Sequence, residues 1–510
     1  MDFGSDWSTF VAFVLRRQPV FSPKHAAYPY QLDALRAVKD LPYAAIFHEQ
    51  GLGKTKIAVD LALSWLQSDT VDTVFVVTKK SLVQNWRREV SGHCHITPHI
   101  LSGNRRQNSI SLNSPVLMYV TNYEAISANA QVIKLFLQTC RVGCILDESQ
   151  KIKNPEAALT RTFLDLSSMF ERRVIMTGTP AANRPYDIWS QIRFLDGGEA
   201  LGGAFDSFKR EMDLPGGAVD ASAYGARLVT IHRRLAAFSV RETKNTAGIH
   251  LPEKTITAHQ VELPAWQMAK YIAYRDELAY EFEIDGSLKV DDVESILKRL
   301  LRLVQCASNP ALVDGRRDLE PGKYSLLLDM CREFTADSKV IIWTGFVDNV
   351  EWLAEKLAEF KPVRVHGALP ISQRDKAVDD FTNSSNPVLV ATPGAAKEGL
   401  TLTSANHAIF FDRGFSLDDY LQAQDRIHRI SQTRECFIHN LIARNTIDEW
   451  VDVLLAAKYR AAQLAQGDID TEDFDNFFRT DVAEVLHGVL FPDRSLRLAA
   501  HHRQPVSESL

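Results

Sequence analysis

Continuous apolar runs of strand length, separated by helical stretches, constrain the fold of this chain more than any other feature. Between residues 28 and 196 the apolar runs predict strands at Ala44–Phe47, Val74–Val77, Val116–Val120, Cys144–Leu146 and Val174–Met176. Helical patterns, such as Lys54–Leu66 and Ser81–Val90, lie between them. Strands that are buried on both faces read as unbroken apolar runs, so this pattern predicts a parallel sheet covered by helices.

The same alternation returns in residues 331–464. Strands are predicted at Val340–Trp343, Val363–Val365, Val388–Ala391, Ala408–Phe411 and Phe437–Leu441. Helices are predicted at Asp348–Phe360, Ser372–Phe381, Leu417–Ile430 and Ile447–Leu464. The fold class is therefore α/β, with a first lobe at 28–196 and a second at 331–464. Residues 197–330 show Gly-rich turns and charged helical stretches without alternation, which predicts a helical insert between the lobes.

The two ends of the chain lie outside this alternation. Residues 1–27 predict an extension with one short amphipathic helix that ends near Pro19, and residues 465–510 predict an acidic and then polar tail. No stretch approaches the roughly 20 apolar residues of a membrane-spanning helix, so we expect no membrane contact.

Charge and cysteine content limit the function classes. Of the 510 residues, 58 are Lys or Arg and 64 are Asp or Glu, which gives a net charge of −6. Any surface that binds phosphates must therefore be local. The six cysteines form no CxxC pair, which is typical of a reduced, cytoplasmic protein.

A glycine-rich segment, His48-Glu49-Gln50-Gly51-Leu52-Gly53-Lys54-Thr55, follows the first predicted strand and opens a helix. Glycines let backbone N–H groups turn toward phosphate oxygens, and the helix N-terminus adds partial positive charge. In such a loop Lys54 reaches the β and γ phosphates and Thr55 holds Mg²⁺. The full phosphate-loop pattern has Gly where His48 stands. The alternative is a helix-starting Gly turn with a solvated lysine.

Two adjacent carboxylates, Asp147 and Glu148, end the predicted strand Cys144–Leu146. Ligands of open α/β sheets bind at the carboxyl ends of the strands. Asp147 is predicted to hold Mg²⁺ and Glu148 to deprotonate the attacking water. Alone, the pair could equally be a solvated strand end.

In the second lobe, Arg426 and Arg429 stand at positions i and i+3 of the predicted helix Leu417–Ile430, and so on one helix face. Two arginines from a second lobe could stabilise charge on a phosphoryl group held by the first, as arginine fingers do. Taken alone, solvated surface arginines are the simpler explanation.

Together these segments resemble the motor core of helicase superfamily two, and more narrowly the Swi/Snf-type DNA translocase ATPases. The resemblance covers about residues 28 to 460 and follows the family's motif order. Its further motifs are Tyr30-Gln31, Val77–Trp86, Thr121–Glu124, Asp147–Pro155, Met176–Pro180, Pro252–Lys254, Leu301–Pro310, Gly399–Asn406 and Gln422–Gln432. It implies two RecA-like lobes that close on ATP.

The resemblance also implies roles for single residues. ATP binding is implied for Gln31, Gly51, Gly53, Lys54 and Thr55, and catalysis for Lys54, Asp147, Glu148, Arg426 and Arg429. Coupling of hydrolysis to motion is implied for Gln150, Thr177, Gly399 and Gln422, and proximity to DNA for Lys80, Ser81, Asn122 and Thr392.

The chain departs from the family pattern at four positions. His48 replaces an acidic residue and Gln150 replaces a His or similar residue, while Thr401 and Ser431 stand where Asn and Gly are usual. The resemblance implies that the change at Gln150 alters the coupling of hydrolysis to motion, and we expect the hydrolysis chemistry to be unchanged. No chromatin-reading appendage is evident, so the chain is more similar to compact bacterial or phage members.

The resemblance therefore implies a nucleic-acid-dependent ATPase that uses ATP and Mg²⁺. It would translocate along, or remodel, double-stranded or branched DNA and its bound proteins without sequence preference. Two alternatives stay open: a strand-separating or annealing helicase on forks or RNA, and a non-hydrolysing DNA-binding scaffold.

Overall fold

The computed structural model describes most of the chain. The described residues are Val11, 19–101, 104–181, 183–212, 221–249, 251–284, 293–315, 319–396, 402–477 and 482–492. The chain divides into two compact units. The first comprises Met1–Asp213, Gly225–His250 and Ala462–Asp468, and the second comprises Leu214–Tyr224, Leu251–Ala461 and Ile469–Leu510.

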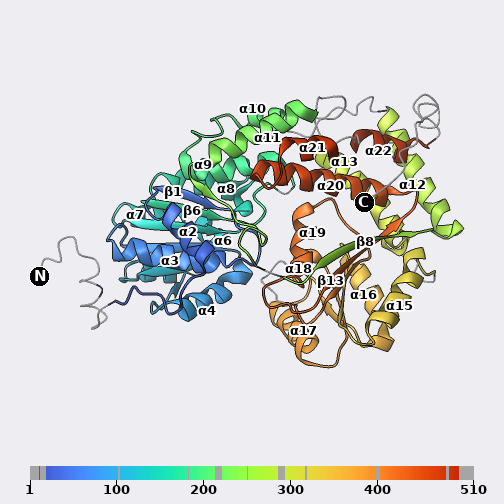
Figure 1. The fold of residues 1–510 in the computed structure, drawn as a ribbon, viewed down its shortest axis with the longest axis horizontal. Coiled ribbons are helices and arrows are strands. Elements are labelled where there is room, and N and C mark those ends of the chain that lie inside the picture. Colours follow the sequence, from blue (N-terminus) through green and yellow to red (C-terminus); the bar gives the residue numbers. More distant parts are fainter. Residues whose placement is uncertain are drawn as a thin grey trace, which may run out of the picture. The chain divides into compact units, whose positions relative to one another are not determined.

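A seven-stranded parallel sheet forms the centre of the first unit (Figure 1). Its strands are β1 (Tyr43–Ile46), β2 (Thr73–Thr78), β3 (His99–Ile100), β4 (Met118–Asn122), β5 (Val142–Asp147), β6 (Arg172–Met176) and β7 (Ser239–Val240). They lie in the order β3-β4-β2-β5-β6-β1-β7. Every predicted strand of the first lobe is present to within a few residues at each end.

Helices cover both faces of this sheet. They are α2 (Pro29–Val38), α3 (Lys54–Gln67), α4 (Val83–His93), α5 (Arg105–Leu112), α6 (Tyr123–Ala128), α7 (Ala130–Leu137), α8 (Ala158–Ser167), α9 (Trp189–Asp196), α10 (Phe205–Met212) and α11 (Ala221–Leu235). The first core cluster joins α3 and α4 to one face of the sheet, and Phe136 of α7 stacks on Phe75 of β2 on the other face.

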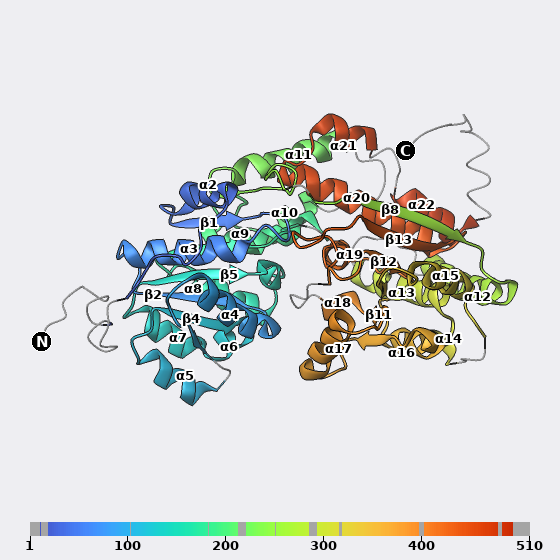
Figure 2. The same ribbon diagram turned by 60° about the horizontal axis from the view of Figure 1, so that its bottom comes forward.

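The second unit contains a six-stranded parallel sheet, in the order β10-β11-β9-β12-β13-β8 (Figure 2). Its strands are β8 (Lys254–Val261), β9 (Val340–Trp343), β10 (Val363–Val365), β11 (Val388–Ala391), β12 (His407–Phe410) and β13 (Cys436–Ala443). Two parallel sheets with covering helices confirm the predicted α/β fold class.

Helices of very different lengths make up most of the rest of this unit. They are α12 (Ala265–Ile284), α13 (Val293–Ser308), α14 (Ala311–Asp314), α15 (Gly322–Phe334), α16 (Val347–Lys356), α17 (Ile371–Asn383), α18 (Pro393–Ala396), α19 (Leu417–Gln424), α20 (Ile447–Gln466), α21 (Thr471–Phe477) and α22 (Val482–Leu490). Side chains of α17 and α19 pack on one face of the sheet, and those of α15 and α16 pack on the other. Among the described helices, none combines the length and apolar character that a bilayer crossing needs.

The range 197–330 is not purely helical, which differs from the prediction. It is divided between the two units, and it contributes β7 to the first sheet and β8 to the second. Neither strand is a continuous apolar run: β7 has two residues, and β8 reads Lys-Thr-Ile-Thr-Ala-His-Gln-Val. The predicted tail also holds α21 and α22. The helix predicted before Pro19 lies almost entirely outside the described residues.

Candidate nucleotide site

The segment from His48 to Thr55 forms a tight loop between β1 and α3. Gly51 and Gly53 have φ angles of +89° and +69°, a region that L side chains rarely adopt. A Cβ atom on Gly53 would also lie 2.4 Å from Nε2 of Gln31. The loop therefore requires glycine at both positions, as the phosphate-loop interpretation predicts.

Lys54 begins α3, and its ammonium group turns back over this loop. Nζ donates hydrogen bonds to the carbonyl oxygens of His48 (2.8 Å) and Glu49 (3.2 Å). The loop carbonyls thus hold a cation next to the N-terminus of a fourteen-residue helix. Together the ammonium group and the helix N-terminus favour binding of an anion such as a phosphate group.

His48 has a fully buried side chain in this loop. Burial, and then the charge of Lys54, lower the pKa of His48 to about 4. The imidazole is therefore neutral at physiological pH and adds no charge beside Lys54. The departure from the family's acidic residue thus removes a negative charge without introducing a positive one.

Tyr30 and Gln31 form a family motif in which ATP binding is implied for Gln31, and both contact the loop from α2. The Tyr30 hydroxyl and Nε2 of Gln31 each donate to the carbonyl oxygen of Leu52, both at 3.2 Å. Gln31 is buried, and its Oε1 accepts a hydrogen bond from the backbone N–H of Tyr28 (3.0 Å). In this structure the pair therefore supports the shape of the phosphate loop.

The carboxylate pair and the phosphate loop lie at the same edge of the sheet, where the strands have their carboxyl ends. Strand β6 lies between β5 and β1, and its Met176 is in register with both Asp147 of β5 and Ile46 of β1. Parallel strands lie about 4.8 Å apart, so these two strand ends are separated by about 10 Å. Residues distant in sequence therefore form one site at the carboxyl ends of the strands.

Asp147 is held by donors from three segments. Nε1 of Trp86 (2.7 Å) and Oγ1 of Thr78 (3.0 Å) both donate to its Oδ2, and the Tyr123 hydroxyl donates to its backbone carbonyl (2.8 Å). Burial, and then repulsion from Glu148, raise the pKa of Asp147 to about 6, while the two side-chain donors oppose this rise.

The donor set at Asp147 fits a divalent cation. Among the described contacts, both side-chain hydrogen bonds end on Oδ2, which leaves Oδ1 for a metal ion. Thr55 supplies a hydroxyl in the first turn of α3. Carboxylate and hydroxyl oxygens are the hard ligands that Mg²⁺ prefers, usually together with water and substrate phosphates.

Glu148 follows directly, in a left-handed backbone conformation with φ 54° and ψ 52°. A non-glycine residue in this region is uncommon and is often found at functional sites. Its Oε2 accepts a hydrogen bond from Nε2 of Gln150 and lies 3.7 Å from Nζ of Lys79. Gln150 therefore orients the carboxylate that we predicted to be the general base.

Thr177 and Gly178, which follow β6, lie between these two elements in the strand order. The backbone N–H of Thr177, a fully buried residue, donates to the carbonyl oxygen of Ile46 (3.2 Å). The side chain of Gln50 packs on Gly178, where a Cβ atom would be 3.0 Å away. The predicted coupling motif thus contacts the phosphate loop directly.

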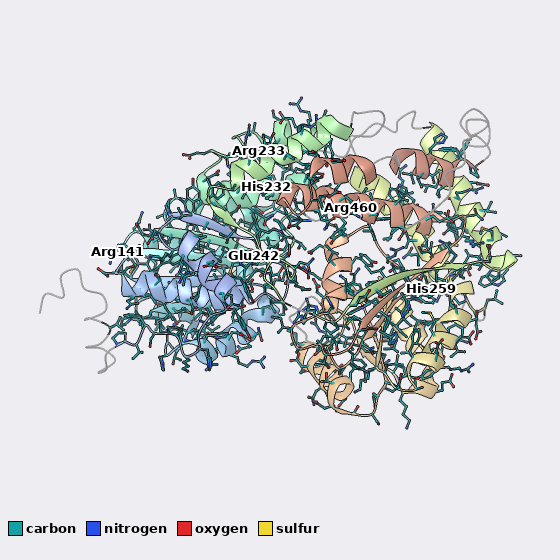
Figure 3. All side chains as sticks on the ribbon, viewed as in Figure 1. Arg141, His232, Arg233, Glu242, His259 and Arg460 are labelled. Carbon is teal, nitrogen blue, oxygen red and sulfur yellow. The ribbon has the colours of Figure 1, made fainter. Side chains whose placement is uncertain are left out.

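A loop after β7, which the sequence did not indicate, encloses the other side of the phosphate loop. Arg241 donates to the carbonyl oxygen of Phe47 (2.5 Å), and the N–H of Glu49 donates to the carbonyl oxygen of Glu242 (2.8 Å), a residue labelled in Figure 3. Nζ of Lys244 lies 3.1 Å from the Glu49 carboxylate. The basic residues Arg241 and Lys244 could have indicated this loop from the sequence. They were overlooked because they lie in the range that was predicted to be a helical insert.

In the second unit, the predicted helix through Arg426 and Arg429 is wrong. Helix α19 ends at Gln424, and both arginines lie in the turns that follow. The carbonyl oxygens that would continue the helix have other donors: Arg426 accepts from the N–H of Leu402 (3.0 Å), and Ile427 accepts from Nε2 of Gln432 (2.9 Å). The i and i+3 argument therefore does not apply.

This turn is nevertheless tightly fixed. Arg426 is buried, and Nε of the half-buried Arg429 donates to the carbonyl oxygen of Asp425 (2.9 Å). His428 contacts the carbonyl oxygen of Pro252 through Nε2 (2.9 Å), and Lys254 donates to Oε1 of Gln424 (3.2 Å). The Pro-Glu-Lys motif and the arginine motif thus form one cluster within this unit.

The other predicted residues have mixed surroundings. Gln422 is buried and donates to Asp418 (2.8 Å), whereas Gly399 lies outside the described residues. Lys80 is exposed and Ser81 is half-buried in the short helix Lys80–Leu82. Asn122 caps α6 by accepting from the N–H of Ala125 (2.9 Å), and Thr392 is buried after β11. Asn122 thus has a structural role whether or not it lies near DNA.

Two family models match the chain. The SNF2-related domain matches residues 41–312, and the helicase conserved C-terminal domain matches residues 322–431. The chain belongs to the SNF2-related family. The predicted resemblance to Swi/Snf-type ATPases is confirmed, and the first match includes the phosphate loop, the carboxylate pair and the loop after β7.

Curated relatives agree with this assignment. The chain is 28% identical over 462 residues to a zebrafish (Danio rerio) protein named DNA repair and recombination protein RAD54-like, an alignment that covers 79% of the chain and 60% of that protein. It is 26% identical to the zebrafish chromodomain-helicase-DNA-binding protein 1-like, covering 85% and 43%. It is 25% identical to an ATP-dependent helicase of Mycoplasma genitalium, covering 82% and 40%. The chain thus spans about half the length of these relatives.

A solved structure titled Sulfolobus solfataricus SWI2/SNF2 ATPase core in complex with dsDNA is also similar. It has 26% sequence identity and a TM-score of 0.41, and the alignment covers 92% of the chain and 97% of that structure. This TM-score is too low to add to the assignment, which rests on the family models.

Proposed function

We propose that the chain is a DNA-dependent ATPase that couples ATP hydrolysis to translocation along, or remodelling of, double-stranded or branched DNA and its bound proteins. The observation that carries the proposal is the register of the first sheet, in which Met176 pairs with both Asp147 and Ile46. This register brings the carboxylate pair and the phosphate loop to one edge of the sheet. Membership of the SNF2-related family supports the same enzyme class.

In this proposal the first unit binds ATP. Backbone N–H groups of the loop and Lys54 would hold the β and γ phosphates, and Thr55 with Asp147 would hold Mg²⁺. When bound, Mg²⁺ neutralises charge that develops on the phosphate oxygens. Glu148, oriented by Gln150, accepts the proton of the attacking water. Trp86 and Thr78 fix the orientation of the Asp147 carboxylate, which would hold the cation.

The second unit is proposed to supply Arg426 and Arg429. An arginine finger stabilises charge on the transferred phosphoryl group, and its planar guanidinium suits that role. Gln422, Gln150 and Thr177 are proposed to link the state of the nucleotide to movement. Gly399 is included among these proposed coupling residues because its motif resembles that of the Swi/Snf-type ATPases.

Duplex or branched DNA, bound without sequence preference, is the proposed partner. The names of two relatives refer to DNA repair and DNA binding, and the proposal extends that partner to this chain. Lys80, Ser81, Asn122 and Thr392 are proposed to lie near the DNA. All six cysteines are free thiols, which supports a location in a reducing cytoplasm, and we propose a bacterial or phage-infected cell.

Triplex displacement tests translocation. With ATP, the protein is expected to remove a third strand from a duplex, and to leave a plain duplex of equal length paired. The Glu148→Gln variant provides the inactive control. Unwinding of forks without triplex displacement would favour a strand-separating helicase, and no phosphate release on any nucleic acid would favour a scaffold.

A further inference from the structure

Strand β8 is an unusually long sheet edge for this molecule. It has eight residues and forms the outermost strand of the second sheet, beside β13 (Figure 1). The other three edges of the two sheets are β3, β7 and β10, which have only two or three residues each. Short edge strands are one way in which proteins avoid unwanted strand pairing, but β8 is not short.

Apart from Lys254 at its start, β8 also lacks a bulge, a proline and charged residues that would protect the edge. The register with β13 runs without interruption from Lys254 to Val261, so the strand has no bulge. Residues 255–261 read Thr-Ile-Thr-Ala-His-Gln-Val and include no proline, lysine or acidic residue. Four consecutive residues, from Thr255 to Ala258, are exposed, so side chains on both faces of the strand are accessible.

The hydrogen bonds at the two ends of the β8–β13 pairing show which backbone groups of β8 point away from the sheet. The N–H of Cys436 donates to Glu253 and that of Arg444 donates to Val261, both at 2.9 Å. Backbone direction alternates along a strand, so the odd-numbered residues of β8 bond to β13. The N–H and carbonyl groups of Lys254, Ile256, Ala258 and Gln260 therefore point away from the sheet.

We propose that β8 pairs with β8 of a second copy of this chain, in an antiparallel arrangement about a two-fold axis at Thr257. This register places Ile256 opposite Ala258 of the second copy, and Lys254 opposite Gln260 of the second copy. It pairs all four outward residues of each copy, which gives about eight backbone hydrogen bonds, and it places no like charges opposite each other. Such an interface is isologous and closed, so association stops at two copies.

Several observations favour a second copy over a foreign peptide. The segment 255–261 has four β-branched residues and no Lys, Arg, Asp or Glu, and a second copy offers the same extended segment. Ile256 is 51% exposed and would pack against a small Ala in the same register. His259, labelled in Figure 3, lies opposite Thr255 of the second copy, so no bulky residues meet directly.

The test is sedimentation velocity of the full chain at about 1 to about 100 µM, the range in which small interfaces associate. We expect a concentration-dependent monomer–dimer equilibrium. Ala258→Pro removes an outward N–H without breaking the ladder to β13, so this variant is expected to stay monomeric. Ile256→Lys places a charge on the same edge and is expected to weaken dimerisation at least tenfold. The matched control is Ile371→Lys, since Ile371 is 47% exposed on α17, and it should dimerise normally.

A wild-type chain that is monomeric throughout this range would overturn the proposal, as would a dimer that persists in both edge variants. A labelled peptide with the sequence of Lys254–Val261 separates the remaining case. If the wild-type chain is monomeric but binds this peptide, the edge accepts an extended strand but two whole chains do not pair, and the proposal is overturned. ATP turnover of each variant, measured in parallel, reports on folding, because neither Ile256 nor Ala258 contributes to the proposed nucleotide site.

Discussion

At the residue scale, the proposed chemistry depends on two charged side chains with different tasks. Lys54 lies over the phosphate loop, and Glu148 lies beside Gln150 at the end of β5. In the proposed mechanism, Lys54 binds phosphates and Glu148 accepts a proton. Their removal should therefore give different defects.

We expect Lys54→Ala to weaken ATP binding by about 10- to 100-fold, because a charge-assisted contact to phosphate is lost. Glu148→Gln should keep ATP affinity within a few-fold and lower turnover by about 10²- to 10⁴-fold, because the amide keeps the shape but cannot accept the proton. Fluorescent-nucleotide titration and phosphate release on both variants measure the two effects. Equal loss of binding in both would contradict the assigned roles.

Trp86 is predicted to tune the metal site through Asp147. We expect Trp86→Phe to raise the Mg²⁺ concentration for half-maximal turnover by about tenfold, because the donor that orients the carboxylate is lost. The measurement is ATP turnover against Mg²⁺ concentration. Trp65→Phe is the matched control, since the Trp65 indole donates to the carbonyl oxygen of Lys39 (3.1 Å), away from the carboxylates. The same shift in both variants would show a general packing effect instead.

At the element scale, three neighbouring strands of the second sheet carry a row of histidines. Nδ1 and Nε2 of His439 on β13 contact Nε2 of His259 on β8 (3.0 Å) and Nδ1 of His407 on β12 (3.2 Å). Burial, and then the two neighbouring histidines, lower the pKa of His439 to about 3. Burial lowers the pKa of His407 and His259 as well.

These lowered values predict acid sensitivity of the second sheet. The unfolded chain takes up protons at these histidines below about pH 6.5, whereas the folded chain takes them up only at lower pH. The stability that they contribute is thus complete above pH 6.5 and is lost as pH falls toward 3. The loss is up to about 1.4 kcal/mol per pH unit for each histidine.

His439→Phe tests this prediction. The ring stacks on Phe334 and His407, and phenylalanine preserves that packing. We expect lower stability at pH 8, because His259 and His407 lose a partner, but a shallower fall in the free energy of unfolding between pH 6.5 and 4. Urea unfolding at a series of pH values measures both. His487→Phe on α22 is the control, and an unchanged pH slope in His439→Phe would contradict the account.

Elements also show how far sequence reasoning reaches. The strands next to the site were predicted to within a few residues at each end, because strands buried on both faces are continuous apolar runs. Strand β8 was missed because its exposed edge position gives it polar residues, and β7 because two residues carry no pattern. The end of α19 was missed because nothing in Asp425–Ile430 disfavours a helix. It ends there because Leu402 and Gln432 take its carbonyl groups, and such distant contacts leave no local signal.

In the site, too, some residues could be predicted from the local sequence and others could not. Lys54, Asp147 and Glu148 were predicted because each has a local motif with a physical reason for its spacing. The partners of Asp147 were not, since Trp86 and Tyr123 lie 61 and 24 residues away in sequence. Only the order of strands in the sheet brings them together.

At the scale of the whole molecule, the account requires both units to act on one triphosphate. Loss of an arginine finger affects the transition state more than binding. We therefore expect Arg429→Ala to bind ATP nearly normally and to lower turnover by about 10³-fold or more. Arg429→Lys should restore little, because a point charge cannot replace the planar guanidinium.

Phosphate release and nucleotide affinity, measured on the same two variants, test this prediction. Arg444→Ala is a suitable control, since Arg444 forms an exposed ion pair with Glu262 in the same unit. If Arg429→Ala keeps most of its turnover, then Arg429 does not act on the phosphoryl group.

The measurement that tests the central claim most directly is steady-state phosphate release with and without duplex DNA, compared with single-stranded DNA, forks and RNA. We expect duplex or branched DNA of any sequence to stimulate turnover, and Glu148→Gln to abolish it. Stimulation should weaken as salt rises, with a slope in log affinity of about −0.9 for each phosphate contact on duplex DNA. Turnover that no nucleic acid changes, or that depends strongly on base sequence, would contradict the account.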